Sequence, residues 1–152
     1  MALHTPSISV EEHLARILSE VSAMPPTRVR LQDAAGLVLA EDVTASVDVP
    51  SFDNSSMDGY AVRRDDLLSA TAETPVALPV TADLAAGTAL DPHVGSGNAA
   101  RIMTGAPMPD GADAVVPIEA TDQGIVTVSI RETPEPGAFV RRIGSDVHIG
   151  DL

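Results

Sequence analysis

Residues 113–132 read DAVVPIEATDQGIVTVSIRE and carry the clearest hairpin signal in the chain. Two runs rich in Val and Ile flank the turn-forming segment 121–124, which predicts a β-hairpin between residues 114–120 and 125–131. Similar short apolar or alternating runs, separated by Gly, Pro and Asp, recur elsewhere in the chain, at residues 27–31, 36–45, 59–63, 75–82 and 139–143. The sequence therefore predicts a β-rich body.

The N-terminal segment has the pattern of an amphipathic helix. Ser9 and Glu12 have the spacing of a capping box, in which each side chain pairs with a backbone N–H at the start of a helix. Apolar residues follow at helical spacing and Pro25-Pro26 ends the pattern, so we expect a helix within residues 9–24. Its apolar face would consist of Val10, Leu14, Ile17, Leu18 and Val21. This face needs a packing partner, and the expected fold class is mostly β with α (α+β).

The glycine-rich segment GSGNAA at 95–100 has two interpretations. It matches G-x-G-x-x-A, but a dinucleotide site requires a buried strand before the first Gly and a long helix after the last. The preceding residues 91–94, DPHV, do not resemble such a strand. We therefore favour a loop that leads into a brief helix over residues 98–103.

The composition limits the classes of function. The chain has 152 residues with no Trp, one Tyr and two Phe, so a single domain with an aliphatic core is expected. Its 22 acidic and 9 basic residues give a formal net charge of −13, which opposes binding to nucleic acid and to anionic membranes. The chain has no Lys for Schiff-base chemistry and no Cys for a disulfide or a thiolate site. It shows no signal peptide and no long apolar run, so a cytoplasmic protein is expected.

The stretch SFDNSSMDGYAV at 51–62 is dense in oxygen donors. These donors are carried by Asp53, Asn54, Ser55, Ser56 and Asp58. Such groups suit a Mg²⁺ ion that keeps water ligands and bridges to substrate phosphates. They also bind neighbouring backbone groups, so a structured turn around Gly59 is the alternative. Phe52 and Tyr60, two of the three aromatic residues, are expected to anchor the two ends of this loop.

Other polar groups carry weaker signals. Surface positions are expected for three of the four histidines, His4, His13 and His93. Asp146 and His148 could present two metal ligands from one strand face, although a pair of ligands arises readily by chance. The arginine doublets at 63–64 and 141–142 are expected to be solvated partners of the abundant carboxylates, with a local anion site as the alternative.

Three motifs identify a family resemblance. They are VPSFDNSSMDGYAVR (49–63), RIMTGAPMPDGADAVVPIE (101–119) and VRRIGSDVHIGD (140–151). In order and separation they resemble the molybdopterin molybdenumtransferase family, which includes the C-terminal domain of gephyrin. The first two motifs are long and highly specific. The resemblance covers essentially the whole chain but only the front part of the longer family members.

This resemblance implies an arrangement of parts. Residues 1–26 would form an N-terminal helix that packs on an α/β domain absent from this chain. Residues 27–47 and 140–152 would form a short linking and dimer-forming segment, and residues 48–139 an inserted β-rich domain. The chain would be the N-terminal portion of the enzyme, as a fragment or a truncated product.

The resemblance also implies an activity. Family members insert molybdate into adenylylated molybdopterin, with hydrolysis of the adenylate and release of AMP, in a Mg²⁺-dependent reaction that yields molybdenum cofactor. The implied cofactor is Mg²⁺, and the implied partners are a second copy in a homodimer and the upstream adenylyltransferase. Because the pterin-binding domain is absent, the isolated chain is expected to show no turnover. The alternative is a non-catalytic β-rich binding or dimerisation module.

The residues that match functional positions of the family are few. Asp58, Thr104 and Asp146 are the catalytic candidates. By resemblance, Asp58 and Asp146 hold Mg²⁺ or its waters, while Thr104 positions phosphate or pterin adenylate. Supporting candidates for substrate binding are Asn54, Ser55 and Arg101.

Two positions depart from the family pattern. Ser56 stands where the family commonly has Ala, a change expected to leave the loop intact. Ser145 stands where an acidic residue often precedes the motif's Asp, which removes one negative charge beside Asp146.

Overall fold

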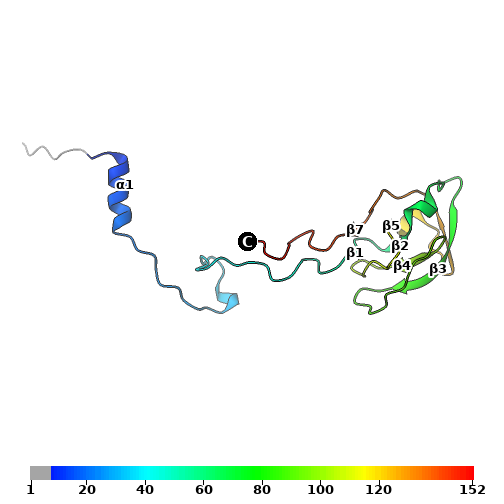
Figure 1. The fold of residues 1–152 in the computed structure, drawn as a ribbon, viewed down its shortest axis with the longest axis horizontal. Coiled ribbons are helices and arrows are strands. Elements are labelled where there is room, and N and C mark those ends of the chain that lie inside the picture. Colours follow the sequence, from blue (N-terminus) through cyan, green and yellow to red (C-terminus); the bar gives the residue numbers. More distant parts are fainter. Residues whose placement is uncertain (1–7) are drawn as a thin grey trace, which may run out of the picture. The chain divides into compact units, whose positions relative to one another are not determined.

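The computed structural model describes residues 8–152. The chain divides into two compact units, of which the first runs to Asp42 and the second is Val43–Leu152. Figure 1 labels α1 in the first unit and the strands in the second. His4 lies outside the described residues, so its expected surface position stays a prediction.

The first unit contains the expected N-terminal helix, α1, which spans Val10–Ser19. The capping box is confirmed, because the Ser9 hydroxyl oxygen accepts the Glu12 N–H at 3.1 Å and a Glu12 carboxylate oxygen accepts the Ser9 N–H at 2.9 Å. The helix ends earlier than residue 24. At its last turn the Ser19 hydroxyl donates to the Arg16 carbonyl at 2.8 Å, a side-chain contact of the kind that competes with helix hydrogen bonding.

The remainder of the first unit is irregular. The expectation of strands over residues 27–31 and 36–45 is wrong, because the only regular element that begins in either segment is a short 3₁₀ helix, η1 (Leu31–Asp33). No residue of α1 is buried, and its apolar stripe is exposed. Apart from Ala45, whose backbone exchanges hydrogen bonds with Gly150 and Asp151, these runs lack the cross-strand pairing and face packing that turn β propensity into a stable strand.

The second unit is built on two sheets (Figure 1). The smaller is the antiparallel pair β1 (Asn54–Ser55) and β7 (Val140–Arg141). The larger has the order β5-β2-β4-β3-β6, and only its β3–β4 pair is parallel. Its strands are β2 (Gly59–Val62), β3 (Val76–Leu84), β4 (Ala99–Ile102), β5 (Ala114–Pro117) and β6 (Thr127–Ile130), with the 3₁₀ helices η2 (Arg64–Leu67) and η3 (Ile118–Ala120) in the connections.

The larger sheet curls so that the segment after one edge strand pairs with the other edge. Residues 120–122, which follow β5, lie against β6 through the Thr121–Ile130 bridge and two backbone hydrogen bonds of 3.1 and 3.2 Å. The predicted hairpin is therefore wrong for β5, which pairs with β2 instead. The two predicted runs meet only through residues 120–122, which pair with β6. This contact covers the outer edge of β6.

The segment that follows the glycine-rich loop is a strand, so the predicted helix over 98–103 is wrong. Ala99 and Ala100 favour helix locally, but they are fully buried between β2 and β3, where sheet pairing overrides propensity. The dinucleotide interpretation also fails, because no helix follows the loop. The loop is instead held by the Asp66 carboxylate, which accepts the Ser96 hydroxyl and the Gly97 N–H, both at 2.7 Å.

Along β2, β4 and β5 both faces of the larger sheet carry buried residues, whereas one face of β3 is exposed. Along β2, Tyr60 and Val62 enter one apolar cluster, while Ala61 enters the other. Tyr60 is fully buried and donates its hydroxyl proton to the Gly124 carbonyl at 3.1 Å. Tyr60 thus anchors its end of the loop as expected. The expectation for Phe52 is wrong, because its side chain is 46% exposed.

The fold class is confirmed as mostly β with one N-terminal helix. The core of the described residues is aliphatic apart from Tyr60, as the composition predicts. The finer boundaries at residues 26, 47 and 139 stay predictions.

Gly59 provides a test of this packing. A Cβ at residue 59 would overlap the Val116 carbonyl oxygen on β5, so Gly59→Ala should lower the free energy of unfolding by about 1–3 kcal/mol or more. Gly95→Ala is the matched control, because the nearest atom to a Cβ there is 3.7 Å away. Urea denaturation followed by circular dichroism measures both variants, and equal unfolding midpoints for them would contradict the packing described.

Candidate functional site

The candidate site is centred on Asp58 and Thr104. One carboxylate oxygen of Asp58, Oδ1, accepts both the backbone N–H and the hydroxyl of Thr104, each at 2.7 Å. The other oxygen, Oδ2, accepts no hydrogen bond from residues 8–152. The structure therefore joins two of the three predicted catalytic residues directly and leaves one carboxylate oxygen free.

The strand register explains this contact. Gly59 pairs with Ile102 across the antiparallel strands β2 and β4. Asp58 lies immediately before β2 and Thr104 shortly after β4, so the two residues occur at the same end of the strand pair. On the other side of Asp58, its carbonyl accepts the Ile118 N–H at 3.0 Å. Pairing on both sides holds the backbone from which the Asp58 carboxylate projects.

The pKa of Asp58 lies below its ordinary value. The main cause is the hydrogen bond from the Thr104 backbone N–H, followed by that from the Thr104 hydroxyl. Desolvation opposes this effect and raises the pKa by a smaller amount. The positive charge of Arg101 lowers the pKa further, as the weakest contribution. Asp58 is thus an exposed, ionised carboxylate at neutral pH.

Both hydrogen-bond donors of Thr104, the backbone N–H and the hydroxyl, donate to Asp58. A phosphate oxygen has no hydrogen to donate, so Thr104 could bind phosphate only by turning its hydroxyl away from the carboxylate. In the structure as it stands, Thr104 holds Asp58.

Arg101 supplies the nearest positive charge on the same strand pair. It lies on β4 directly opposite Tyr60, and its guanidinium is 3.5 Å from the Asp83 carboxylate on β3. Its Nε atom is buried and has no hydrogen-bond partner in the described part of the chain. Asp83 partly balances the positive charge, which still contributes to the lowered pKa of Asp58.

Asn54 and Ser55 are buried, not presented to solvent. The Ser55 hydroxyl donates to the Met57 carbonyl at 2.5 Å, and Asn54 Nδ2 donates to the Phe52 carbonyl at 3.1 Å. The backbone of Ser55 exchanges hydrogen bonds with the loop after Thr104, through Gly105 at 2.8 Å and Ala106 at 3.0 Å. Both side chains shape the loop, which matches the structured-turn alternative for this part of the motif.

Asn54 leaves one polar atom without a partner. Its side chain is almost fully buried, at 4% exposure, and its Oδ1 atom accepts no hydrogen bond from the described residues. A direct role of Asn54 or Ser55 in substrate binding stays a prediction.

Asp146 is exposed, and its backbone is hydrogen-bonded to the segment before β1, not to Asp58 or Thr104. Its backbone N–H donates to the Val49 carbonyl at 2.9 Å, and its carboxylate contacts the Ser145 hydroxyl at 3.4 Å. No hydrogen bond or ion pair within residues 8–152 joins it to Asp58 or Thr104. The neighbouring His148 faces Asp48, with Nδ1 3.5 Å from a carboxylate oxygen.

No complete metal site is present among residues 8–152, where no three His, Asp or Glu side chains gather closely enough to hold an ion. His13 and His93 are exposed as expected, and His93 pairs with Asp110 at 2.8 Å. The free oxygen of Asp58 is one hard ligand. That donor set fits only an ion such as Mg²⁺ that keeps several water molecules or takes further ligands from a substrate.

From the sequence alone, Asp53 is one of several oxygen donors and Arg142 is half of an arginine doublet expected to be solvated. In the structure the Asp53 carboxylate accepts from Arg142 at 2.5 Å and from the Ile143 N–H at 2.8 Å. The Ile143 backbone contact followed by Arg142 lowers the pKa of Asp53 against a smaller desolvation effect. Asp53 lies in the first motif and Arg142 in the third, which marks both residues in the sequence. The sequence alone does not show that the two side chains form a pair.

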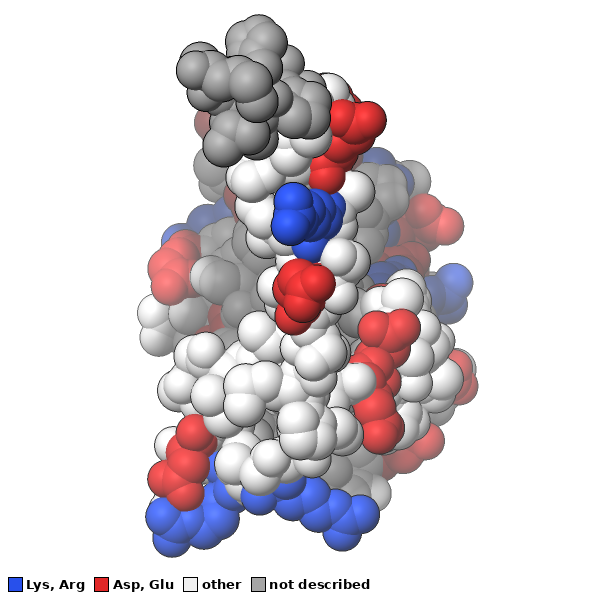
Figure 2. All heavy atoms as spheres, turned by 90° about the vertical axis from the view of Figure 1, so that its left-hand side faces the viewer, with Lys and Arg blue, Asp and Glu red and all other residues white. Residues whose placement is uncertain are grey.

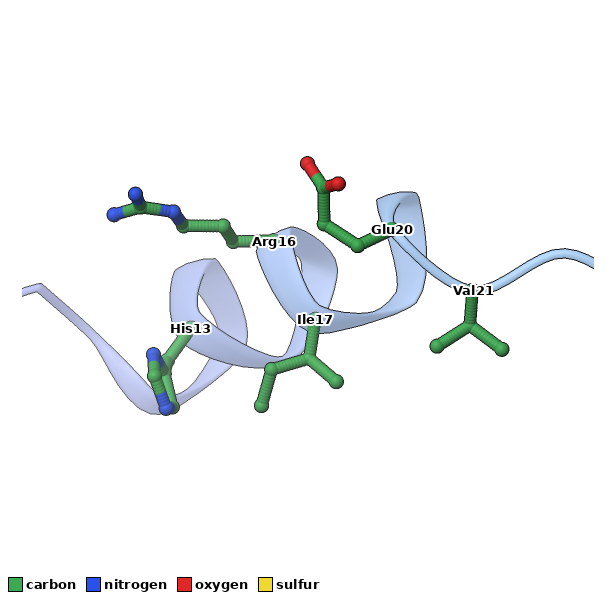
Figure 3. A pocket seen from close by; sticks show the side chains of 5 residues that line it. All are labelled: His13, Arg16, Ile17, Glu20 and Val21. Carbon is green, nitrogen blue, oxygen red and sulfur yellow. The ribbon is translucent and has the colours of Figure 1, made fainter.

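Two hollows are lined by residues other than the candidate site residues. One of about 360 Å³ is lined by His13, Arg16, Ile17, Glu20 and Val21. Figure 3 shows that these side chains all come from α1 and the residues at its end, so this hollow is lined by a single element and is unlike the concave site in which a small molecule is usually bound. A second, of about 420 Å³, is lined by Glu132, Thr133, Pro134, Glu135, Ala138 and Phe139.

Acidic side chains are spread over the face drawn in Figure 2, in keeping with the net charge of −13. Within the described residues, no helix is both long and apolar enough to cross a membrane.

Comparisons with known proteins agree with the three motifs. The family model described as "MoeA N-terminal region (domain I and II)" matches residues 8–152. Molybdopterin molybdenumtransferase 2 of Mycobacterium tuberculosis is 49% identical over 142 residues, which cover 93% of this chain and 35% of that protein. Molybdopterin molybdenumtransferase of Staphylococcus aureus is 37% identical over 145 residues, which cover 95% of this chain and 35% of that protein.

A solved structure has the same fold. The molybdopterin biosynthesis MoeA protein of Pyrococcus horikoshii OT3 matches with a TM-score of 0.85 and 31% identity, over 93% of this chain and 38% of that one. The chain spans about a third of the length of the curated relatives that it matches.

Thr104→Val tests the electrostatics of the site. The substitution removes the hydroxyl donor but keeps the backbone N–H, so the pKa of Asp58 should rise toward its ordinary value. A carboxylate with a lowered pKa stabilises the fold above its unfolded-state pKa and loses that contribution as pH falls through the folded-state pKa, so this acid-sensitive contribution should shrink. Carboxyl ¹³C NMR titration measures the change.

The control for this titration is within the same spectrum. The pKa of Asp122 is lowered chiefly by the Ser129 N–H and should not move in Thr104→Val. An unchanged Asp58 titration, or an equal shift of both residues, would contradict the assignment.

Proposed function

The chain belongs to the MoeA N-terminal family, and from that premise we propose that it supplies the N-terminal part of a molybdopterin molybdenumtransferase. The reaction would insert molybdate into adenylylated molybdopterin and release AMP during formation of molybdenum cofactor. The observation that carries the proposal is the Asp58–Thr104 pair, in which an ionised carboxylate keeps one oxygen that accepts no hydrogen bond from the described residues.

Asp58 is the proposed magnesium ligand. Its lowered pKa keeps the carboxylate charged, and its Oδ2 atom is not used by the described residues. Bound Mg²⁺ would neutralise phosphate charge on the adenylate. Thr104 would orient the carboxylate through both of its donors and would contact phosphate if the hydroxyl changes partner, while the Arg101 guanidinium supports an anionic substrate.

Asp146 is the second proposed magnesium ligand. It is exposed and has one long contact, to Ser145 at 3.4 Å, so its carboxylate is available to a metal or to bound water. We propose that the remaining ligands come from substrate phosphate, water and protein outside this chain. On this basis the isolated chain has no turnover, and the active form is a homodimer that receives substrate from the upstream adenylyltransferase.

A non-catalytic binding or dimerisation module is the second candidate. The observation in its favour is that Asn54 and Ser55, although polar and within the first motif, are buried and bonded to their own loop. Under this reading the motif would be retained for folding alone, and the free carboxylate of Asp58 would have no role.

A chimera tests the proposal. Residues 8–152 replace the matching third of the Mycobacterium tuberculosis relative, and molybdate insertion is measured as molybdenum cofactor formed from adenylylated molybdopterin. Asp58→Asn keeps the size and a hydrogen-bond acceptor but removes the charge, so we expect a fall of about 10²-fold or more in rate at saturating substrate.

Asp110→Asn is the matched control, because it removes an exposed carboxylate of the same unit that pairs with His93. Its rate should equal that of the unsubstituted chimera. An active chimera in which Asp58→Asn retains full Mg²⁺-dependent activity would refute the role of Asp58 and favour the binding module.

A further inference from the structure

Asp53 connects all three sequence motifs. Its carbonyl accepts the Met108 N–H at 2.9 Å, which ties the first motif to the second. Its carboxylate accepts the Ile143 N–H at 2.8 Å through Oδ1 and the Arg142 guanidinium at 2.5 Å through Oδ2, which ties the first motif to the third. One residue therefore holds segments that are 55 to 90 residues apart in sequence.

The carboxylate fills a gap in backbone pairing. β1 and β7 pair Asn54 with Arg141, and the same two chain segments meet again where Val49 bridges Val147. The two segments differ by one residue between these points, so the regular ladder is interrupted. The Ile143 N–H lies in the interruption and finds a side-chain carboxylate where a ladder would offer a carbonyl.

Asp146 follows directly from this junction. Beyond Ile143, the Gly144 N–H donates to the Pro50 carbonyl at 2.9 Å, and the Asp146 N–H donates to the Val49 carbonyl at 2.9 Å. Gly144 is buried with a φ of 71°, a backbone conformation that fixes a sharp change of direction. The segment 143–146 is thus attached to the segment 49–53 at three successive points.

We propose that Asp53 is a positioning residue that sets where Asp146 lies relative to the loop before β2, which carries Asp58, and the loop after β4, which carries Thr104. This inference rests on the proposed function, because it gives Asp53 a role through the two carboxylates proposed to bind Mg²⁺. The ion pair is partly solvated, with Arg142 61% and Asp53 32% exposed, and exposed pairs contribute little to global stability. Its effect is therefore on local geometry.

Asp53→Ala and Asp53→Asn in the full 152-residue chain separate the two contacts. The alanine variant loses both, whereas the asparagine oxygen can still accept the Ile143 N–H. In Asp53→Ala we expect amide hydrogen exchange of Gly144 and Asp146, as well as Ile143, to accelerate about tenfold or more, with buried amides of β2 and β4 unchanged. Asp53→Asn should restore most of the protection, and Asp110→Asn should match the native chain.

Metal affinity is the second measurement. It changes only if Asp53 positions the proposed metal ligands, and not if the loss of Asp53 merely makes residues 143–146 more mobile. Mn²⁺ is used in place of Mg²⁺ with the chimera described above, which supplies the ligands proposed to lie outside this chain, and its dissociation constant is measured by water-proton relaxation. Loss of a residue that orients metal ligands typically weakens affinity about tenfold or more, so Asp53→Ala should show this loss, Asp53→Asn a smaller one, and Asp110→Asn none.

The outcomes distinguish this inference from the proposed function. If exchange accelerates at Ile143 alone, or if Mn²⁺ affinity is unchanged in Asp53→Ala while Asp58→Asn weakens it, the positioning role is overturned. If Asp58→Asn leaves Mn²⁺ affinity unchanged, the metal assignment in the proposed function fails, and the exchange of Gly144 and Asp146 still decides whether Asp53 holds the segment.

Discussion

The second unit depends on the close pairing of β2 with strands on both sides. β2 lies between β4 and β5, and its four residues Gly59–Val62 are all buried. Gly59 permits the approach of β5, because any side chain there would meet the Val116 carbonyl. The same pairing fixes the residue immediately before the strand, which is Asp58. A requirement of packing thus determines where the carboxylate at the centre of the candidate site lies.

Features that depend on neighbouring residues were predictable from sequence. The capping box at Ser9, the approximate position of α1 and the strand at 76–84 follow from local spacing and alternation. The pairing of strands in the sheet was not predictable, because the sequence of a single strand does not identify the strand with which it forms hydrogen bonds. The run at 114–117 is a strand as expected, but it pairs with β2 about 55 residues earlier in the sequence instead of with the nearest run. Ala99 and Ala100 have helical propensity but form a strand, because β4 lies between β2 and β3 and buries one alanine in each apolar cluster.

The same limit applies to the candidate site. The resemblance singled out Asp58 and Thr104, and the structure brings them into contact without any local sequence signal for it, since they are 46 residues apart. The structure also changes the role expected for Thr104. Both of its donors are bonded to the Asp58 carboxylate, so they are not available to phosphate in this arrangement. The polar character of Asn54 and Ser55 suggested ligand contacts, but their burial could be known only once β1 was placed beside β7 and the loop after Thr104.

The dense polarity of the first motif has more than one cause. Asn54 and Ser55 are turned inward and stabilise the loop, Asp53 is shared between two distant segments, and only Asp58 combines a lowered pKa with a free oxygen at the surface. These neighbours satisfy backbone donors and acceptors around the loop, and the second oxygen of Asp58 accepts no hydrogen bond from the described residues. A carboxylate that is charged, oriented and still incompletely bonded is suited to a ligand.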